Sequence, residues 1–196
     1  MEKFKPYAEI VYDYKNIKIP YNILLTANEW REKRESIIKR ETNICQVCHN
    51  RCMDEYILKI VNNFVLNVPA IYDEIIIEKD YIDQFSGEIQ FSYEETIIKL
   101  VEQSEPRIPH VHHKHYVLNH LPWEYFDDDL MLVCHICHSK IHETEIINVY
   151  SDHSKKQILK FEICSKCNGA GHLREYHYHQ NGVCFSCNGV RYNLIN

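Results

Sequence analysis

Histidine and cysteine residues gather in the middle of the chain, between residues 110 and 142. This stretch contains Cys134 and Cys137, followed by His138 and His142. Residues four apart on a helix lie on one face, one turn apart, which is the spacing at which two imidazoles can bind one metal ion. A third ligand would then come from elsewhere in the chain. Three protein ligands with one open position are typical of catalytic zinc sites, whereas four are typical of structural ones.

The cysteine count favours metal binding over disulfide bonds. Eight of the nine cysteines form C-x-x-C pairs, which are 45/48, 134/137, 164/167 and 184/187. The first residues contain no apolar segment of the kind found in a secretory signal. Many thiols without such a signal indicate a reducing compartment, so we expect a cytoplasmic protein. We expect the ninth cysteine, Cys52, to be a buried thiol, with a role as a substitute ligand as the alternative.

Length and charge limit the classes of function. The 196 residues suffice for one compact domain, or for one domain with small satellites. No run of about 18 apolar residues occurs, so we expect no membrane partner. Residues 53–105 carry 3 Lys/Arg against 12 Asp/Glu, while residues 1–52 and 154–196 are basic. The net charge of −6 is unusual for a duplex-binding protein, but a bound cation can supply positive charge where a phosphate lies.

The central stretch resembles the zinc-containing HNH endonucleases, which are built on the ββα-metal finger. The resemblance rests on residues 24–52 and on the run His112-His113 … Asp129-Leu-Met-Leu-Val-Cys134-x-x-Cys137-His138-x-x-x-His142. It implies that His112, His138 and His142 bind the catalytic metal and that His113 is the general base. An Asn that holds the loop and the base in the family corresponds here to Asp129, which accepts hydrogen bonds but cannot donate them as Asn does.

One geometric condition follows from this assignment. Adjacent residues on a regular strand point to opposite faces. His112 and His113 can therefore share one site only at a strand end or in a distorted loop. For His110, His115 and His120, which have no counterpart in the resemblance, we expect solvent-exposed positions or positions beside the metal ligands.

The cysteine pairs fit two structural zinc sites. The resemblance to HNH endonucleases implies that one site combines Cys45, Cys48, Cys134 and Cys137. The segments Cys164-Ser-Lys-Cys167-Asn-Gly-Ala-Gly and Cys184-Phe-Ser-Cys187-Asn-Gly resemble half of the cysteine-rich zinc region of DnaJ-type chaperones. This second resemblance implies a zinc ribbon held by Cys164, Cys167, Cys184 and Cys187. A glycine after the C-x-x-C pair supplies the positive-φ turn that lets backbone amides approach the thiolates.

Together the charge pattern and the two resemblances imply an α+β protein with a ββα-metal (HNH) finger, a structural zinc knuckle, an acidic insertion and a C-terminal zinc ribbon. The expected parts are residues 1–52 with the first zinc knuckle, the acidic insertion 53–107, the ββα-metal core 108–153 and the zinc ribbon 154–196. We expect the insertion to pack on the rest of the chain, with docking of a protein partner as the alternative.

Local patterns also predict individual elements. Loose alternation predicts a hairpin within residues 7–20. A helix is predicted from about Ala27 to Arg40, with Thr26 and Glu29 as its capping box. A second helix is predicted from about Tyr93 to Glu102, with Ser92 and Glu95 as its box. Short strands are predicted at 146–150 and 158–163.

The expected activity is metal-dependent hydrolysis of DNA phosphodiester bonds. The catalytic ion would be Mg²⁺, Mn²⁺, Ni²⁺ or Zn²⁺ in addition to two structural zinc ions, and three imidazoles favour a transition metal over Mg²⁺ in affinity. An RNA-directed nuclease of the same fold is one alternative, because phosphate chemistry is common to both nucleic acids. The other is a non-catalytic, zinc-stabilised module that binds nucleic acid or protein.

Overall fold

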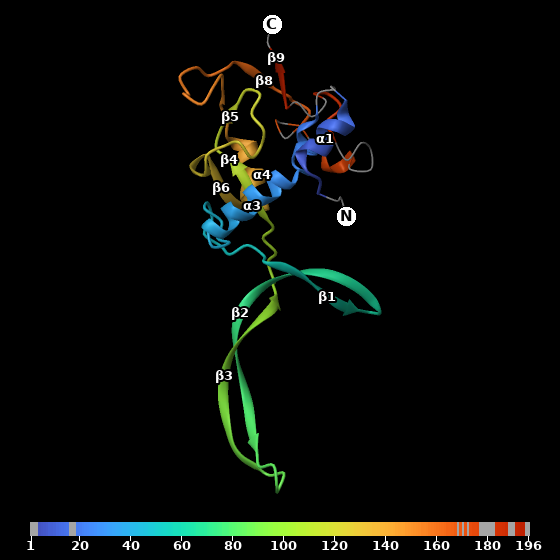
Figure 1. Cartoon of the computed structure of the whole chain (residues 1–196), viewed down its shortest axis with the longest axis vertical. Helices are drawn as coiled ribbons and strands as arrows, with labels where there is room; N and C mark the ends of the chain where they lie inside the picture. Colours follow the sequence, from blue (N-terminus) through green and yellow to red (C-terminus); the bar gives the residue numbers. More distant parts are fainter. Residues whose placement is uncertain are drawn as a thin grey trace. The chain divides into compact units, whose positions relative to one another are not determined.

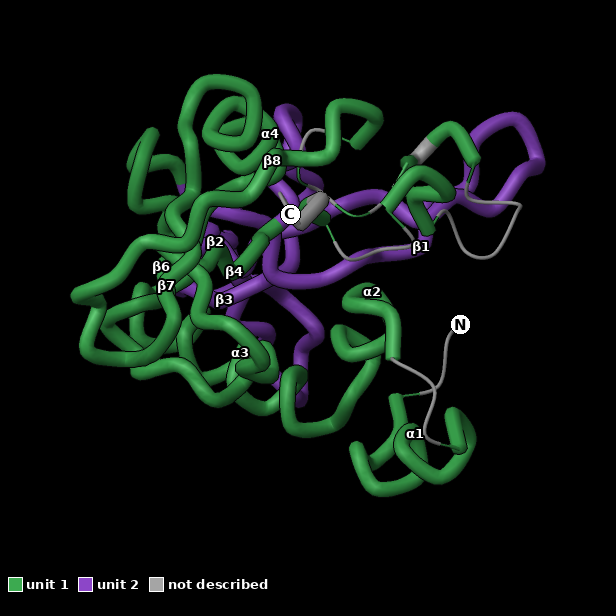
Figure 2. The backbone as a smooth tube through the Cα atoms, turned by 90° about the horizontal axis from the view of Figure 1, so that it is seen from above, with its two compact units in different colours: residues 1–50, 109–196 green, residues 51–108 purple. Residues whose placement is uncertain are grey.

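The computed structural model describes residues 4–15, 19–167, 169, 171, 173–176, 183–187 and 191–194. The fold is a mixed α+β arrangement in which the sheets are antiparallel except for one short parallel pair. By the contacts among its residues, the chain divides into two compact units (Figure 2). Unit 1 comprises residues 1–50 and 109–196, and unit 2 comprises residues 51–108. Among the described residues, no helix has the length and apolar character needed to span a membrane.

Unit 1 is built around a short antiparallel pair of strands followed by a helix (Figure 1). Strand β4 (Pro109–His113) pairs with β6 (Leu130–Cys134), and α4 (His135–Thr144) follows β6 directly. The short 3-10 helix η1 (Asp127–Asp129) leads into β6. Strands β5 (Tyr116–Val117) and β7 (Val149–Tyr150) form a parallel pair. Buried residues from these elements and from the N-terminal helices form one core, which includes Ile10, Trp30, Ile37, Val111, Tyr116, Tyr125, Leu130 and Val149.

Helix α3 (Asn28–Arg40) confirms the helix predicted between Ala27 and Arg40, but the predicted capping box is wrong. The N-cap residue is Ala27. The Thr26 hydroxyl instead donates to the carbonyl of Ile23, and the Glu29 carboxylate accepts the backbone N–H of Tyr7 at 3.0 Å. Glu29 therefore connects two helices instead of closing its own first turn.

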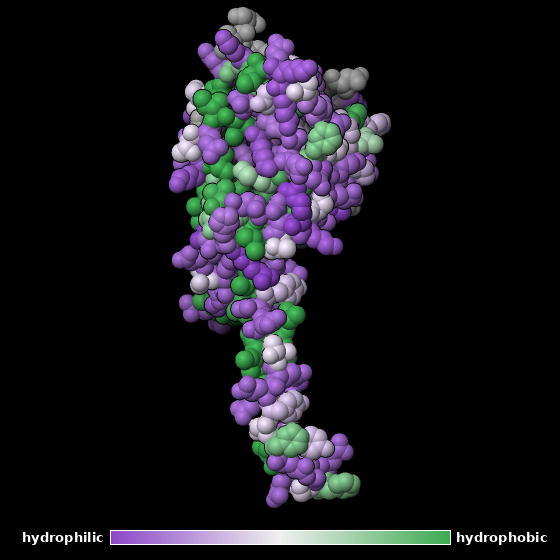
Figure 3. Space-filling view, turned by 90° about the vertical axis from the view of Figure 1, so that its left-hand side faces the viewer, coloured by the Kyte–Doolittle hydropathy of each residue, from purple (hydrophilic) through white to green (hydrophobic). Residues whose placement is uncertain are grey.

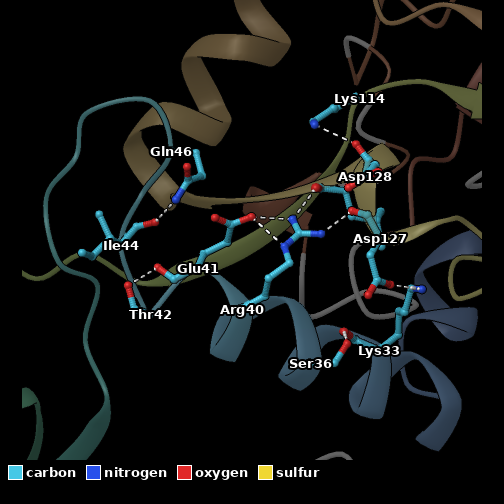
Figure 4. A network of polar contacts seen from close by, with 11 residues as sticks. Lys33, Ser36, Arg40, Glu41, Thr42, Ile44, Gln46, Lys114, Asp127 and Asp128 are labelled. Atoms are coloured by element: carbon cyan, nitrogen blue, oxygen red, sulfur yellow. Dashed lines mark hydrogen bonds and ion pairs between the residues drawn. The ribbon is translucent and has the colours of Figure 1, made fainter.

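The cations on α3 dock the helix onto the segment before β6 (Figure 4). Arg40 donates to the carbonyl oxygens of Asp127 at 2.6 Å and Leu130 at 2.9 Å. Lys33 pairs with the Asp127 carboxylate at 2.5 Å. On the other side, Arg34 donates to the carbonyl of Pro109 at 2.7 Å. Much of the positive charge on this helix is thus engaged in fixing β4 and β6.

The N-terminal segment is helical, so the predicted hairpin in residues 7–20 is wrong where the structure describes it. Helix α1 (Tyr7–Tyr14) follows Pro6, and α2 (Tyr21–Leu24) follows Pro20. Proline favours the start of a helix because its φ is already close to the helical value. Ile10 points into the core from α1, and Glu29 holds the first turn by accepting from Tyr7. The hairpin turn was expected near Tyr14–Asn16, of which Asn16 lies outside the described residues.

The C-terminal part of unit 1 carries strands β8 (Phe161–Ile163) and β9 (Tyr192–Leu194), which pair antiparallel. Another 3-10 helix, η2, spans Arg174–Tyr176. Strands β7 and β8 lie within the predicted strands 146–150 and 158–163 but are shorter. Arg191 connects this part to the core: it donates to Gly169 O at 2.8 Å and to the Tyr116 hydroxyl at 2.6 Å, and its guanidinium lies over the Tyr21 ring.

Unit 2 is a three-stranded antiparallel sheet of long, twisted strands (Figure 1). Its strands are β1 (Glu55–Val61), β2 (Phe64–Ile82) and β3 (Ile89–Glu102). Strand β1 pairs with the first part of β2, and β3 pairs with the rest. The predicted helix at Tyr93–Glu102 is therefore wrong. Ser92, expected to cap it, instead donates its hydroxyl to Asp80 across the sheet.

Replacing Arg40 by Ala should lower the free energy of unfolding by about 1–2 kcal/mol, because two charge-assisted hydrogen bonds to backbone carbonyls are lost. The matched control is Lys39→Ala, at an exposed neighbour on the same helix, for which we expect a change within about 0.5 kcal/mol. Urea unfolding of zinc-loaded proteins measures both. Equal effects of the two substitutions would contradict the docking role of Arg40.

Candidate metal centres

Four cysteines from two distant segments meet beside α4. Cys45 and Cys48 lie in the turn after α3, Cys134 ends β6, and Cys137 lies in the first turn of α4. Their Sγ atoms all lie within 4.8 Å of one another. The turn is fixed to β6 by a hydrogen bond from Gln46 N to Leu132 O at 2.9 Å. Structural zinc sites are typically formed by four cysteines around one ion, and this group is consistent with such a site.

The electrostatics of this cluster also fit a cation. Burial raises the pKa of the Cys48 thiol, but hydrogen bonds with Asn50, Cys45 and Cys137 together outweigh burial and bring that pKa down to about 6. Burial and the neighbouring thiols raise the pKa of Cys137. Four crowded thiols cannot all ionise unless a positive charge lies among them. A divalent zinc ion would supply this charge and deprotonate all four.

Three histidines, carried by β4 and α4, form a second group. His112 comes from β4, and His138 and His142 come from successive turns of α4. One ring nitrogen of each lies within 4.8 Å of the others. The Nε2 atoms of His138 and His142 are 3.3 Å apart. Two nitrogens bound at about 2.0–2.1 Å to one tetrahedral ion would lie at nearly this separation.

The protonation state of these rings suits a metal ligand. Burial lowers the pKa of His112 to about 4 and that of His142 to about 4. Burial, with His142 and His110 nearby, lowers the pKa of His138 to about 2. All three imidazoles are therefore neutral near pH 7, and the neutral imidazole is the form that binds metals. His112 Nδ1 is also buried without a hydrogen-bond partner among the described residues, as expected of an atom whose partner is an ion.

His113 is not part of this group. Its ring stacks on Trp30, with centroids 5.1 Å apart, and contacts Tyr125 edge-on. His113 is only 3% exposed, and burial lowers its pKa to about 3. The regular register of β4 against β6 explains this position, because adjacent strand residues point to opposite faces. His113 Nε2 lies 2.9 Å from Pro122 O, and because a carbonyl only accepts, this nitrogen carries the proton and Nδ1 carries the lone pair.

Asp129 lies directly before β6, where its backbone and side chain have separate partners. Its carbonyl accepts the backbone N–H of Lys114, the residue after His113, at 2.9 Å. Its buried carboxylate accepts from Lys155 at 2.7 Å and lies 3.7 Å from His115 Nε2. The loop beyond His113 is thus held by the backbone of residue 129, and this bond does not require an Asn side chain.

His110 lies beside the three-histidine group, which is one of the two positions expected for it. Its ring stacks on His138, with centroids 4.9 Å apart. His110 and His112 are two residues apart on β4 and therefore share one face of the strand. The two-residue spacing of His110 and His112 in the sequence already indicates this shared face. His115, in contrast, is buried beside Asp129 and is not solvent-exposed.

The second four-cysteine group forms a repeated structure near the C-terminus. The Sγ atoms of Cys164, Cys167, Cys184 and Cys187 lie within 4.8 Å of one another, and all four residues are buried. Gly171 N donates to Cys167 Sγ at 3.2 Å, and Arg191 N donates to Cys187 Sγ at 3.3 Å, each four residues after its cysteine. The predicted positive-φ turn is confirmed at Gly169, with φ 79°. This group is consistent with a second structural zinc site.

Cys52 is fully buried and belongs to neither four-cysteine group.

Comparison with known proteins adds no assignment for any of these centres. No protein-family model matches the chain, and no curated protein or solved structure gives a significant match. The chemistry of the centres therefore has to be argued from their residues.

The purified protein should contain two zinc ions per chain that resist dialysis against EDTA, and a third metal that EDTA removes, because closed thiolate sites bind zinc more firmly than an open imidazole site. Mass spectrometry of the metal content measures this. Cys134→Ser should remove one resistant zinc and destabilise the fold, whereas His138→Ala should retain both. Loss of a resistant zinc from His138→Ala would contradict the separation into closed and open sites.

Metal binding by the three histidines should depend little on pH between about 7.5 and 5.5, because protons compete only as the pH approaches the lowered pKa of about 4. Calorimetric titration with Zn²⁺ of protein whose structural sites are filled measures this affinity. Exposed imidazoles, with pKa near 6.5, would lose up to about tenfold in affinity per imidazole for each pH unit below that value. Such a loss would contradict the shielding of the rings.

Proposed function

We propose that this protein is a metal-dependent endonuclease that hydrolyses phosphodiester bonds of DNA. The observation that carries this proposal is the open three-histidine group, His112, His138 and His142, placed beside a closed four-cysteine group. Three imidazoles leave at least one coordination position for water or a phosphate oxygen. A divalent cation held there would supply Lewis-acid stabilisation of the charge that develops on the phosphate and on the leaving oxygen.

The order of elements supports an HNH-type finger as the scaffold. An antiparallel strand pair, β4 and β6, leads directly into α4, and the ligands lie on the first strand and on the helix. This is the order of a ββα-metal finger, to which the sequence resemblance independently points. The engaged cations on α3 support a structural role for that helix, so we propose that the cation at the three histidines supplies much of the charge that attracts phosphate.

His113 is the proposed general base. Its tautomer supports this role, because the Pro122 carbonyl holds the proton on Nε2 and leaves the Nδ1 lone pair available to accept a proton from water. Its burial opposes the role, since a pKa of about 3 makes a weak base. The proposal therefore requires that a bound substrate brings a water molecule to Nδ1. Asp129 would act as a positioning residue through its backbone bond to Lys114.

Plasmid nicking by wild-type protein and by two variants tests this proposal. His138→Ala should reduce cleavage at least about 100-fold, because a metal ligand is lost. His113→Phe keeps an aromatic ring beside Trp30 and Tyr125 but has no lone pair, and should also reduce cleavage at least about 100-fold. Lys39→Ala is the control. Thermal unfolding and zinc content should stay close to wild-type values in His113→Phe.

The outcomes separate the candidate functions. Cleavage lost in His138→Ala but retained in His113→Phe would keep the nuclease and restrict His113 to packing. Cleavage of single-stranded RNA but not of DNA would favour the RNA-directed nuclease. No cleavage of DNA or RNA with Mg²⁺, Mn²⁺, Ni²⁺ or Zn²⁺, by a folded protein with two zinc ions, would contradict the enzyme and favour a zinc-stabilised binding module.

A further inference from the structure

The sheet of unit 2 leaves large apolar side chains on its surface. In Figure 3, hydrophobic residues reach the surface at intervals along the β2–β3 ribbon towards its tip. Exposed residues occur on all three strands, among them Leu58, Ile60, Val65, Tyr81, Phe91 and Ile98. Because β1 pairs with the first part of β2 and β3 with the rest, the sheet has two strands at each point along most of its length. Two-stranded ribbons are at best marginally stable in water and need another layer against them. A partner that covers this sheet would supply that layer.

The register divides the side chains between two faces. Directly paired residues of antiparallel strands point to the same face, and successive residues alternate. The odd-numbered residues of β2 and β3 up to the tip, with the even-numbered residues of β1, therefore form one face, which we call the apolar face. The remaining residues of the three strands form the opposite face, which we call the acidic face.

Charge is distributed unequally between these faces. The apolar face carries four charged residues of balanced sign, Asp73, Lys79, Glu95 and Lys99. Lys79 forms an ion pair with Glu95, and Asp73 is directly opposite Lys99. The acidic face carries Glu55, Glu74, Glu78, Asp80, Glu94 and Glu102 against the single cation Lys59. Almost all of the acidic excess of these strands thus points to one side, which is the side suited to water.

The apolar face also has the more regular packing. Tyr81 and Phe91 stack with centroids 5.0 Å apart, and Tyr93 lies beside Phe91. Ile75 and Ile97 are directly paired in the middle of the ribbon. On the acidic face, Glu78 is directly opposite Glu94, a like-charge pair that is tolerated best in water. These arrangements favour the apolar face, and not the acidic face, as the surface that a partner covers.

We propose that the apolar face binds the apolar face of a second copy of this chain, so that the protein is a dimer in solution. The balanced charges favour a copy over an acidic or basic partner, because two-fold symmetry can place each acid of one copy near a base of the other. The acidic faces then point outward, at least about 10 Å apart, and are largely screened at physiological salt.

The size of the face is sufficient for a stable dimer. Strand β2 has 19 residues, which at about 3.3 Å per residue corresponds to roughly 60 Å. With two paired strands about 10 Å wide, each copy would cover roughly 600 Å², or about 1,200 Å² for the pair. Specific interfaces begin near this total.

Two substitutions to Glu distinguish the faces. Leu58 is 72% exposed on the apolar face, and Ile98 is 71% exposed on the acidic face, so the same charge is added at equal exposure. The measurement is the molar mass of the full-length, zinc-loaded protein by light scattering and analytical ultracentrifugation. Wild-type protein and Ile98→Glu should have twice the 23.5 kDa mass of one chain. Leu58→Glu should weaken self-association at least about tenfold.

Several results would overturn the proposal. A wild-type protein with the mass of one chain would exclude the dimer. If Ile98→Glu dissociates the dimer as much as Leu58→Glu does, the apolar face is excluded as the interface. The apolar face is also excluded if neither substitution dissociates the dimer. Circular dichroism of both variants must match that of the wild type. If Leu58→Glu loses strand content, Ile60→Glu, at an equally exposed position of the same face, replaces it and must give the same dissociation.

Discussion

The four-cysteine group of Cys45, Cys48, Cys134 and Cys137 is the constraint on which unit 1 depends. It joins a turn after α3 to the junction between β6 and α4, although the whole of unit 2 lies between them in sequence. Closing a loop of this length costs conformational entropy, and a zinc ion bound by the four cysteines would contribute free energy to offset it. Because Cys134 and Cys137 fix the first turn of α4, they also fix the direction in which His138 and His142 point.

Burial serves both the fold and the chemistry in this unit. The rings of His112, His138 and His142 are shielded enough to stay neutral, which prepares them to bind a metal and makes acid unfavourable for the folded state. The same β4 strand directs His113 into the aromatic core on its other side. One strand therefore supplies both a candidate metal ligand, His112, and a core residue, His113, because successive side chains point to opposite faces.

The sequence was most informative where ligand chemistry restricts spacing. The C-x-x-C pairs and the His138–His142 spacing predicted the groups that the structure brings together, because metal ligands tolerate few geometries. Local patterns failed where distant partners decide the conformation. Tyr93, Ile97 and Leu100 have helical spacing, but pairing with β2 makes this segment a strand. Tyr7 to Tyr14 contains strand-forming residues, yet Pro6 and the bond from Tyr7 to Glu29 favour a helix. The position of His113 required the register of β4, which sequence spacing alone does not provide.

The most direct test of the account is anomalous X-ray scattering from crystals soaked in Mn²⁺, recorded at wavelengths that separate manganese from zinc. We expect zinc peaks at the two four-cysteine groups and a manganese peak at His112, His138 and His142, with solvent at the remaining coordination positions. A fourth protein ligand, such as His110 turned inward from β4, would make the site closed and structural. Either that closed geometry or the absence of any metal between the three imidazoles would contradict the central claim of an open, catalytic metal centre.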